Sequence, residues 1–391
     1  MRSVSTFPIW LWVVATLLGL GLFGLGLACV LIPIVFPQSL GMIYSVVSGY
    51  GMLSILLGIG LLVSGIRGWR GRPSHPFFPR RGWLAFLISG LVLGSLAALI
   101  PSLTQASLAF SAFHFALIGL PGLALFSLAA VASGSDAAIS IRHWIVGLTA
   151  GVSTIILAVP VELMGLIVSA TIGVLVTRLL PGGAGEVERL GALLQQWAER
   201  PPTDQADVIA LLTSPTVLVT MVLTLAVVTP VVEELGKTLI LGVVGIWFRP
   251  SVRMAFVWGA ACGLGFAWLE GISNGAIGLG GNAAWLGGVG LRVFATAMHC
   301  TTSGLVGLGW GWFWQGRKWA LPLSYGAAIA FHGLWNLAII LGLSGVGLAV
   351  STPRIGYLLI AVGVLVEVGL ALTAVISLVA IPLALRKRAA A

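Results

Sequence analysis

The chain has 391 residues, of which 59% are hydrophobic and 8% charged, and its formal net charge is +9. Soluble domains carry about 25% charged residues, so this composition excludes an ordinary soluble protein and predicts a polytopic membrane protein. The basic residues lie between apolar segments, as bilayer orientation requires, so we expect no nucleic acid partner. The three cysteines show no CxxC spacing and predict neither a disulfide framework nor a thiolate metal site.

Apolar segments of about 20 residues can cross a bilayer as helices. The sequence has twelve candidates: 8–36, 41–66, 83–103, 108–132, 144–159, 161–177, 208–229, 231–248, 254–276, 291–314, 320–343 and 356–385. Pro160 and Pro230 each either end or kink a helix, so we expect about 12 spans within a range of 10–12. The predicted fold is an all-α, polytopic integral membrane helix bundle.

Four basic clusters predict the orientation of the chain. They occupy 67–81, 249–253, 317–318 and 386–388. With twelve spans, all four fall on one side together with both termini, and the positive-inside rule assigns that side to the cytoplasm. We therefore expect a multi-pass protein of the cell membrane with cytoplasmic N- and C-termini.

The only long polar stretch separates two apolar bundles. It opens with Pro-Gly-Gly, closes with Pro-Pro, and contains apolar residues at helical spacing, which predicts a short helix on the membrane surface or a soluble connector helix. The predicted domains are an N-terminal transmembrane bundle of unknown role (1–177), a polar linker (178–207) and a C-terminal bundle (208–391).

The C-terminal bundle opens with a dense group of charges in apolar sequence. Pro-Val-Val-Glu-Glu-Leu-Gly-Lys occupies 230–237. Ionisable groups at membrane depth are costly and usually face a polar cavity. On a helix, Lys237 can reach either Glu233 or Glu234, which lie four and three residues before it. Pro230 suits a first helical turn, which predicts both glutamates at the N-terminal end of a helix.

Each of the next three spans adds polar groups. They are Phe266 with Glu270, then His299, then His332 with Asn336. At 1.5 Å of rise per residue, these groups and the two glutamates all fall in the outer half of a core about 30 Å thick. Unrelated packing residues would scatter through the depth, so the common depth predicts a single site.

These side chains suit the activation of water. A carboxylate or a bound metal can deprotonate water, while His or Asn donors stabilise the oxyanion on the attacked carbonyl. HExxH does not occur. Each motif alone has an ordinary explanation, such as a structural ion pair or a packed histidine, so the prediction depends on their combination.

In order and spacing, the motifs resemble those of the PrsW family of intramembrane proteases and, more distantly, the CAAX-processing and bacteriocin-processing membrane proteases. The resemblance covers about 205–345, and its motifs are Glu-Glu-x-x-Lys at 233–237, Phe-x-x-x-Glu at 266–270, His299 with Gly304, and His-x-x-x-Asn at 332–336. The family often has Asn after the second-motif Glu and an aromatic residue four positions after it. Here Gly271 and Asn274 stand instead, a departure that concerns the cavity or the substrate.

The resemblance implies an intramembrane endopeptidase, of glutamic or metalloprotease type, that cuts a membrane-anchored protein such as an anti-sigma factor. The expected catalytic residues are Glu233, Glu234, Glu270, His299 and His332, and the expected supporting residues are Lys237, Asn336 and Phe266. Either Glu233 or Glu234 would be the base, with Lys237 holding the other carboxylate ionised. Asn336 would assist the oxyanion or orient His332. The cofactor stays open between none and a zinc ion held by His299, His332 and Glu270.

Two other functions compete with the protease. A multi-span transporter could use midplane ionisable groups to bind a solute or protons. An inactive, protease-like scaffold would only bind membrane proteins. The polar groups come from one bundle, with no matching motif in 1–177, which disfavours the transporter, and the intact set of glutamates and histidines disfavours the scaffold.

Overall fold

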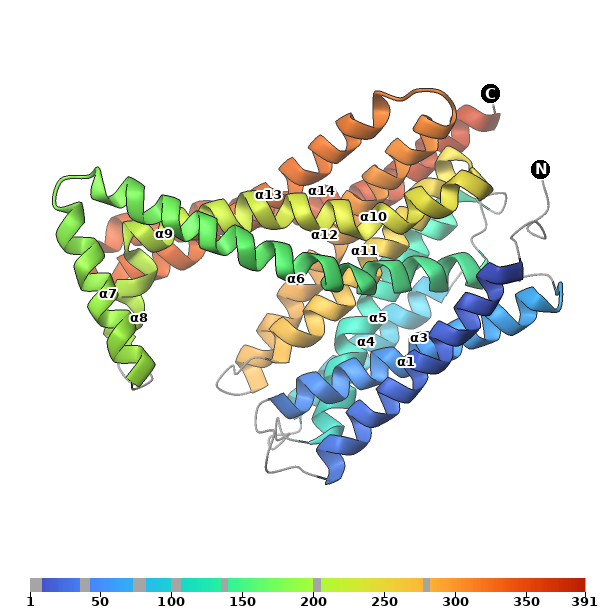
Figure 1. The fold of residues 1–391 in the computed structure, drawn as a ribbon, viewed down its shortest axis with the longest axis horizontal. Coiled ribbons are helices and arrows are strands. Elements are labelled where there is room, and N and C mark those ends of the chain that lie inside the picture. Colours follow the sequence, from blue (N-terminus) through green and yellow to red (C-terminus); the bar gives the residue numbers. More distant parts are fainter. Residues whose placement is uncertain are drawn as a thin grey trace. The chain divides into compact units, whose positions relative to one another are not determined.

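The computed structural model describes residues 9–35, 43–72, 82–99, 107–134, 140–199, 205–276 and 282–390. Within these ranges, all of the secondary-structure elements are helices, as the apolar segments predicted (Figure 1). The helices are α1 (Ile9–Val35), α3 (Ile43–Trp69), α4 (Gly82–Leu99), α5 (Leu108–Ser133), α6 (Ile141–Arg178), α7 (Gly183–Glu199), α8 (Gln205–Thr213), α9 (Pro215–Met221), η3 (Val222–Val228), α10 (Thr229–Phe248), α11 (Val252–Ala276), α12 (Asn282–Trp314), α13 (Ala320–Ser351) and α14 (Pro353–Ala390).

Eight of the described helices are long and apolar enough to cross a membrane, so the chain is a multi-pass membrane protein, but a count of about twelve is not confirmed. The candidates 144–159 and 161–177 form one helix, α6, which continues through Pro160. The candidate 231–248 likewise has no loop before it, because α9, η3 and α10 follow one another directly.

The short element η3 is a π-helix, and it explains why the chain does not break at Pro230. The N–H of Thr229 donates to the carbonyl of Thr224, five residues earlier, and the backbone stays helical at both ends of η3. Proline has no N–H to donate, so a segment that already departs from the i→i−4 pattern accommodates it. Placing the glutamates at a helix N-terminus was therefore wrong, since Glu233 lies 18 residues after the start of the Pro215–Ile246 span and 13 before its end.

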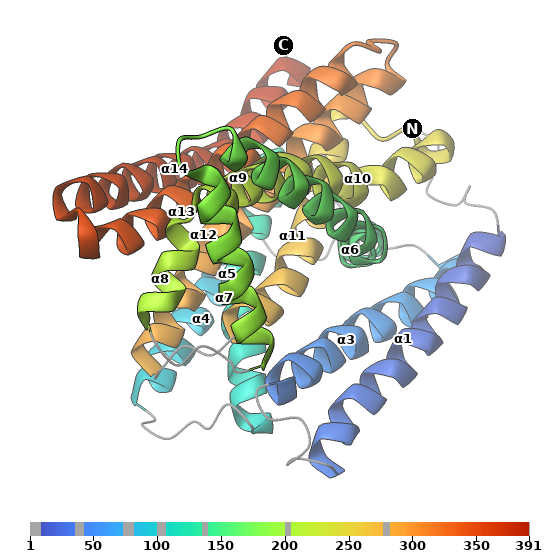
Figure 2. The same ribbon diagram turned by 60° about the vertical axis from the view of Figure 1, so that its left-hand side comes forward.

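The structure divides into two compact units. Unit 1 comprises 1–154, 237–325 and 374–391. Within it, α5 packs against α3, α4, α11 and α12, and α1 pairs with α3, as both Figure 1 and Figure 2 show. The fit at α5 is close, because a Cβ on Gly122 would lie 2.7 Å from a methyl of Leu264. Helices from the first third of the chain thus enclose α11 and α12.

Unit 2 comprises 155–236 and 326–373. The end of α6 meets α9 through a hydrogen bond of 2.8 Å from Thr216 Oγ1 to Thr177 Oγ1, and α13 packs on α14 at Gly363 and Ala338. A helix, α7, occupies the polar stretch 178–207, as expected, while residues 200–204 of that stretch lie outside the described ranges. The division of the chain into 1–177, 178–207 and 208–391 stays a prediction.

Candidate active site

The predicted site residues lie on four helices, α10 to α13, and form one group in each unit. The boundary between the units crosses α10 between Gly236 and Lys237, and crosses α13 between Tyr325 and Gly326. Unit 1 therefore holds Lys237, Phe266, Glu270 and His299, whereas unit 2 holds Glu233, Glu234, His332 and Asn336.

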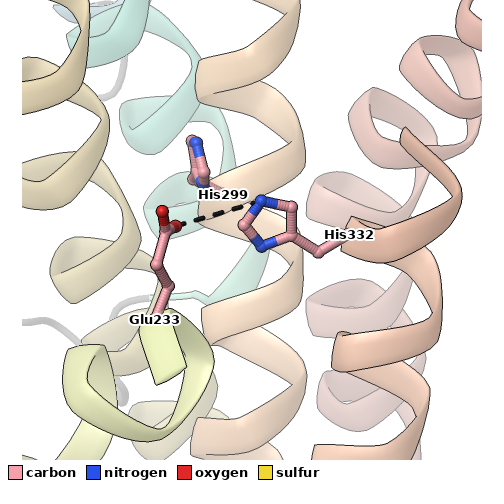
Figure 3. A group of neighbouring side chains, drawn as sticks. All are labelled: Glu233, His299 and His332. Carbon is pink, nitrogen blue, oxygen red and sulfur yellow. Dashed lines mark ion pairs between the residues drawn. The ribbon is translucent and has the colours of Figure 1, made fainter. Parts of the chain in front are cut away.

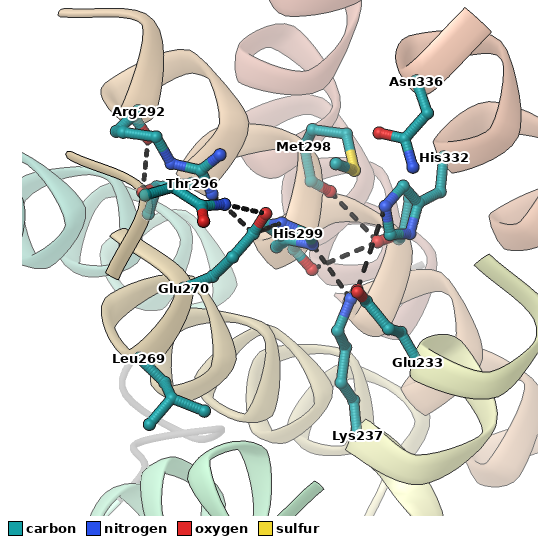
Figure 4. Close-up of polar contacts among 12 residues, drawn as sticks. Glu233, Lys237, Leu269, Glu270, Arg292, Thr296, Met298, His299, His332 and Asn336 are labelled. Atoms are coloured by element: carbon teal, nitrogen blue, oxygen red, sulfur yellow. Dashed lines mark hydrogen bonds and ion pairs between the residues drawn. The ribbon is translucent and has the colours of Figure 1, made fainter. Parts of the chain in front are cut away.

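In unit 1, both ring nitrogens of His299 have polar partners (Figure 4). Nε2 lies 2.8 Å from Oε2 of Glu270 on α11, and Nδ1 lies 2.9 Å from Nζ of Lys237 on α10. An ammonium group can only donate, so Nδ1 accepts. The geometry therefore assigns a neutral imidazole with its proton on Nε2, donated to Glu270.

Two further donors hold the Glu270 carboxylate. Asn274, one turn later on α11, donates from Nδ2 to Oε1 at 3.0 Å, and Arg292 on α12 forms a hydrogen bond and an ion pair with Oε2. Asn274 stands where the family resemblance expected an aromatic residue, and its amide now has a clear role. Arg292 belongs to none of the sequence motifs, although it is the only charged residue in the sequence 282–314, which is a usable signal at membrane depth.

Phe266 packs beside both Lys237 and His299. The Lys237 Nζ lies 4.1 Å from the centroid of its ring, a cation–π contact, and the ring meets the imidazole of His299 edge to face at 5.3 Å. The Lys237 side chain is fully buried. The Phe-x-x-x-Glu motif thus supplies two different supports, a ring for the lysine and a carboxylate for the histidine.

Glycine allows α11 to approach His299 closely. A Cβ on Gly263 would lie 2.1 Å from the backbone carbonyl oxygen of His299, so no larger residue fits without a shift of one helix. Small residues serve this purpose between membrane helices, because they let two backbones meet.

In unit 2, His332 on α13 faces the two adjacent glutamates of α10. Its Nδ1 lies 2.9 Å from Oε1 of Glu234, and its Nε2 lies 3.9 Å from Oε2 of Glu233 (Figure 3). Both carboxylates are buried, Glu234 completely. An ionised carboxylate only accepts, so Nδ1 carries the proton and the lone pair of Nε2 is on the Glu233 side.

The π-helix fixes α13 beside these glutamates. The carbonyl of Leu225 has no ladder donor, because Thr229 bonds to Thr224 and Pro230, five residues after Leu225, has no N–H. Asn336 donates to this carbonyl from Nδ2 at 2.7 Å. One turn earlier on α13, a Cβ on Gly333 would lie 2.4 Å from the carbonyl of Ala226.

The two groups follow the same plan. In each unit a buried histidine has one ring nitrogen bonded to a glutamate on a neighbouring helix, which fixes the tautomer and the ring orientation. Proteins use such carboxylate–histidine pairs to present the other ring nitrogen to a metal ion. The chemistry of this donor set is that of a hydrolytic site.

Comparison with known protein families gives a match that covers the predicted site. The chain matches the PrsW family of intramembrane metalloproteases over residues 144–368, which is more than half of its length. No curated protein and no solved structure matches it. The matched region is wider than the 205–345 covered by the four motifs and includes nearly all of α6 and the whole of α7. Since the match contains every predicted catalytic residue, the chain belongs to the PrsW family of intramembrane metalloproteases and is an intramembrane protease.

Proposed function

We propose that this protease cuts single-span, membrane-anchored proteins and that His299, His332 and Glu233 are the residues that carry out the cleavage. The observation that carries the proposal is the pairing of each buried histidine with a carboxylate, Glu270 in unit 1 and Glu234 in unit 2. The family supports hydrolysis of a membrane protein in a lipid environment. We further propose that the substrate resembles an anti-sigma factor and that both termini of the protease lie in the cytoplasm.

The residues fit a zinc ion. Zinc takes imidazole nitrogen and carboxylate oxygen, and catalytic sites usually offer three protein ligands. We assign His299 through Nδ1, His332 through Nε2, and one carboxylate oxygen of Glu233, whose second oxygen then acts as the base toward the attacking water. Glu270 was a candidate ligand, but His299, Arg292 and Asn274 engage its two oxygens, so an orienting role suits it better. When bound, zinc activates water for attack and polarises the scissile carbonyl.

The remaining steps belong to side chains of this chain. Glu233 accepts a proton from the attacking water, whose oxygen bonds to the carbonyl carbon of the scissile peptide, and later returns the proton to the leaving amine nitrogen as the C–N bond breaks. Glu234 and Glu270 keep the two imidazoles in the required tautomers. Asn336, whose amide is engaged by Leu225, positions α13 and with it His332.

The decisive experiment uses the full-length protein in proteoliposomes with a library of single-span substrates. We expect the wild type to release two fragments, and Glu233→Gln to cut about 10²–10⁴-fold more slowly, the range for loss of a general base. Glu234→Gln should lose less, because an amide oxygen can still accept from Nδ1 of His332. Glu367→Gln on α14 is the matched control and should cut at the wild-type rate.

Metal analysis of the same preparations tests the ligands. His299→Ala and His332→Ala should each lose bound zinc, whereas the Glu367→Gln control should keep it. Cleavage at the wild-type rate by folded Glu233→Gln would overturn the assignment of the base. Zinc-free, fully active wild-type protein would overturn the metal assignment and leave the glutamic-type reaction.

A further inference from the structure

We propose that Arg292 is a positioning residue of the protease site, acting on His299 through Glu270. The inference deepens the proposed function, on which its consequence for zinc binding rests. None of the four sequence motifs contains Arg292, and its ion pair in the site is with Oε2 of Glu270.

The contact geometry places Glu270 between the two side chains. Arg292 Nη2 and His299 Nε2 both meet the same oxygen, Oε2, while Asn274 takes Oε1. The carboxylate therefore cannot rotate without breaking a bond to one of these donors. Loss of Arg292 would leave Glu270 with two donors and free it to turn away from the imidazole.

The positions of these residues explain how Arg292 can influence the His299 ring through Glu270. Arg292 precedes His299 by seven residues on α12, two helical turns on the same face, so a single helix supplies both donors to Oε2. The side chains are 15% exposed for Arg292 and 27% for Glu270. Little water competes there, so the ion pair is stronger than a surface pair.

Arginine suits this role better than lysine. A guanidinium is planar, always charged and directs several donors in fixed directions, so it can fix a carboxylate as well as neutralise it. Lysine would keep the charge but present one flexible point donor. Arg292→Lys should therefore preserve part of the effect, and Arg292→Leu should remove it.

The test measures the His299 ring directly in the full-length protein. Ring ¹⁵N shifts of [¹⁵N]histidine-labelled protein report the tautomer, with the five histidines assigned by single His→Gln variants. We expect a neutral His299 ring protonated at Nε2 in the wild type, and a mixed population in Arg292→Leu. Arg354→Leu, an exposed arginine on α14, is the matched control and should leave the His299 shifts unchanged.

Zinc titration with a competing chelator gives the second measurement. Loss of an outer partner of a ligating histidine typically weakens metal binding about 10–100-fold, and we expect this for Arg292→Leu, with a smaller loss for Arg292→Lys. In a Glu270→Gln background, Arg292→Leu should add almost nothing, because both changes remove the same interaction. Thermal melting of each variant shows whether it is folded, and Arg292→Gln replaces the leucine variant if that one is not.

Two results would overturn the role of Arg292. One is a folded Arg292→Leu protein with wild-type ring shifts and wild-type zinc affinity. The other is full additivity with Glu270→Gln, which would mean that Arg292 acts by another route. The ring shifts need neither metal nor substrate, so a wild type that binds no zinc and cuts nothing would refute the proposed function while the shifts still test Arg292.

Discussion

At the scale of single residues, Lys237 is the most informative side chain of the site. Its fully buried ammonium donates to Nδ1 of His299, the lone pair that we assign to zinc. The lysine and the metal are therefore alternative partners of one nitrogen. Sequence spacing alone suggested a partner among the glutamates of α10, which shows how helical spacing lists possible partners without choosing among them.

The variant Lys237→Met tests this competition. Without metal, a buried acceptor loses its donor, which costs about 1–3 kcal/mol, so the melting temperature should fall. Added Zn²⁺ should restore it, and the zinc affinity should be at least that of the wild type. Lys318→Met, an exposed lysine between α12 and α13, should change neither quantity. A weaker zinc affinity in Lys237→Met would contradict the assignment of Nδ1.

At the scale of elements, the π-helix η3 is the feature that positions His332. It presents the Leu225 carbonyl to Asn336 and the Ala226 carbonyl to Gly333, and both contacts hold α13 against the helix that carries Glu234. At membrane depth no water replaces a lost partner, so these backbone groups need the protein itself.

Substitution of Gly333 should therefore impair the site, although Gly333 takes no part in the reaction. Gly333→Ala places a methyl against a backbone oxygen and should destabilise the protein by about 1–3 kcal/mol and lower the rate of cleavage. Gly326→Ala on the same helix is the control, since a Cβ there meets nothing within 4 Å. Equal melting temperatures and rates for the two variants would show that the close approach at η3 is unimportant.

At the scale of the whole molecule, unit 1 mixes the beginning and the middle of the chain. The helix α5 packs against both α11 and α12, which carry Glu270 and His299. The polar stretch 178–207 predicted a separate C-terminal bundle, but removal of α5 would expose the faces of α11 and α12 that it covers.

A chain that starts at Gln205 should for this reason express poorly or melt at a lower temperature than the full protein, and lose cleavage activity. Co-expression of 1–204 as a separate chain should restore part of the stability and part of the cleavage activity, because it supplies α5 to pack against α11 and α12. Full stability and activity of the short chain by itself would instead support 208–391 as an independent protease bundle.

The orientation in the membrane is open to a direct test. Reporter fusions after Arg72, Arg253, Lys318 and Arg388 should all report the cytoplasmic side, as the positive-inside rule predicts. The continuity of α6 and of α9 to α10 replaces two pairs of candidate spans by two single helices, which leaves the sidedness of these four points unchanged. An external signal at Arg253 would invert α10 and α11.

The sequence predicted the all-α class and drew attention to most of the ionisable side chains that pair within each unit, because charged groups in apolar helices are few and conspicuous, but it did not predict which of them pair. It could not predict the continuity of α6, since proline at 160 is compatible with both a break and an uninterrupted helix. The π-helix could not be predicted either, because Val222–Val228 is an ordinary apolar run. One of its backbone carbonyls is satisfied by Asn336 of α13, a contact that the sequence of the run does not reveal. Arg292 was overlooked because it belongs to no motif, although its isolation in α12 was visible.

The length of α6 has a consequence for the choice of membrane. At 1.5 Å per residue its 38 residues measure roughly 57 Å, nearly twice a hydrocarbon core of about 30 Å. A helix so long must lean far over, bend at Pro160, or extend beyond the lipid tails, and each choice varies with bilayer thickness. We expect cleavage to rise or fall as the acyl chains of the surrounding phospholipids are lengthened from 14 to about 22 carbons, which would make the thickness of the membrane a determinant of where in a cell this protease works.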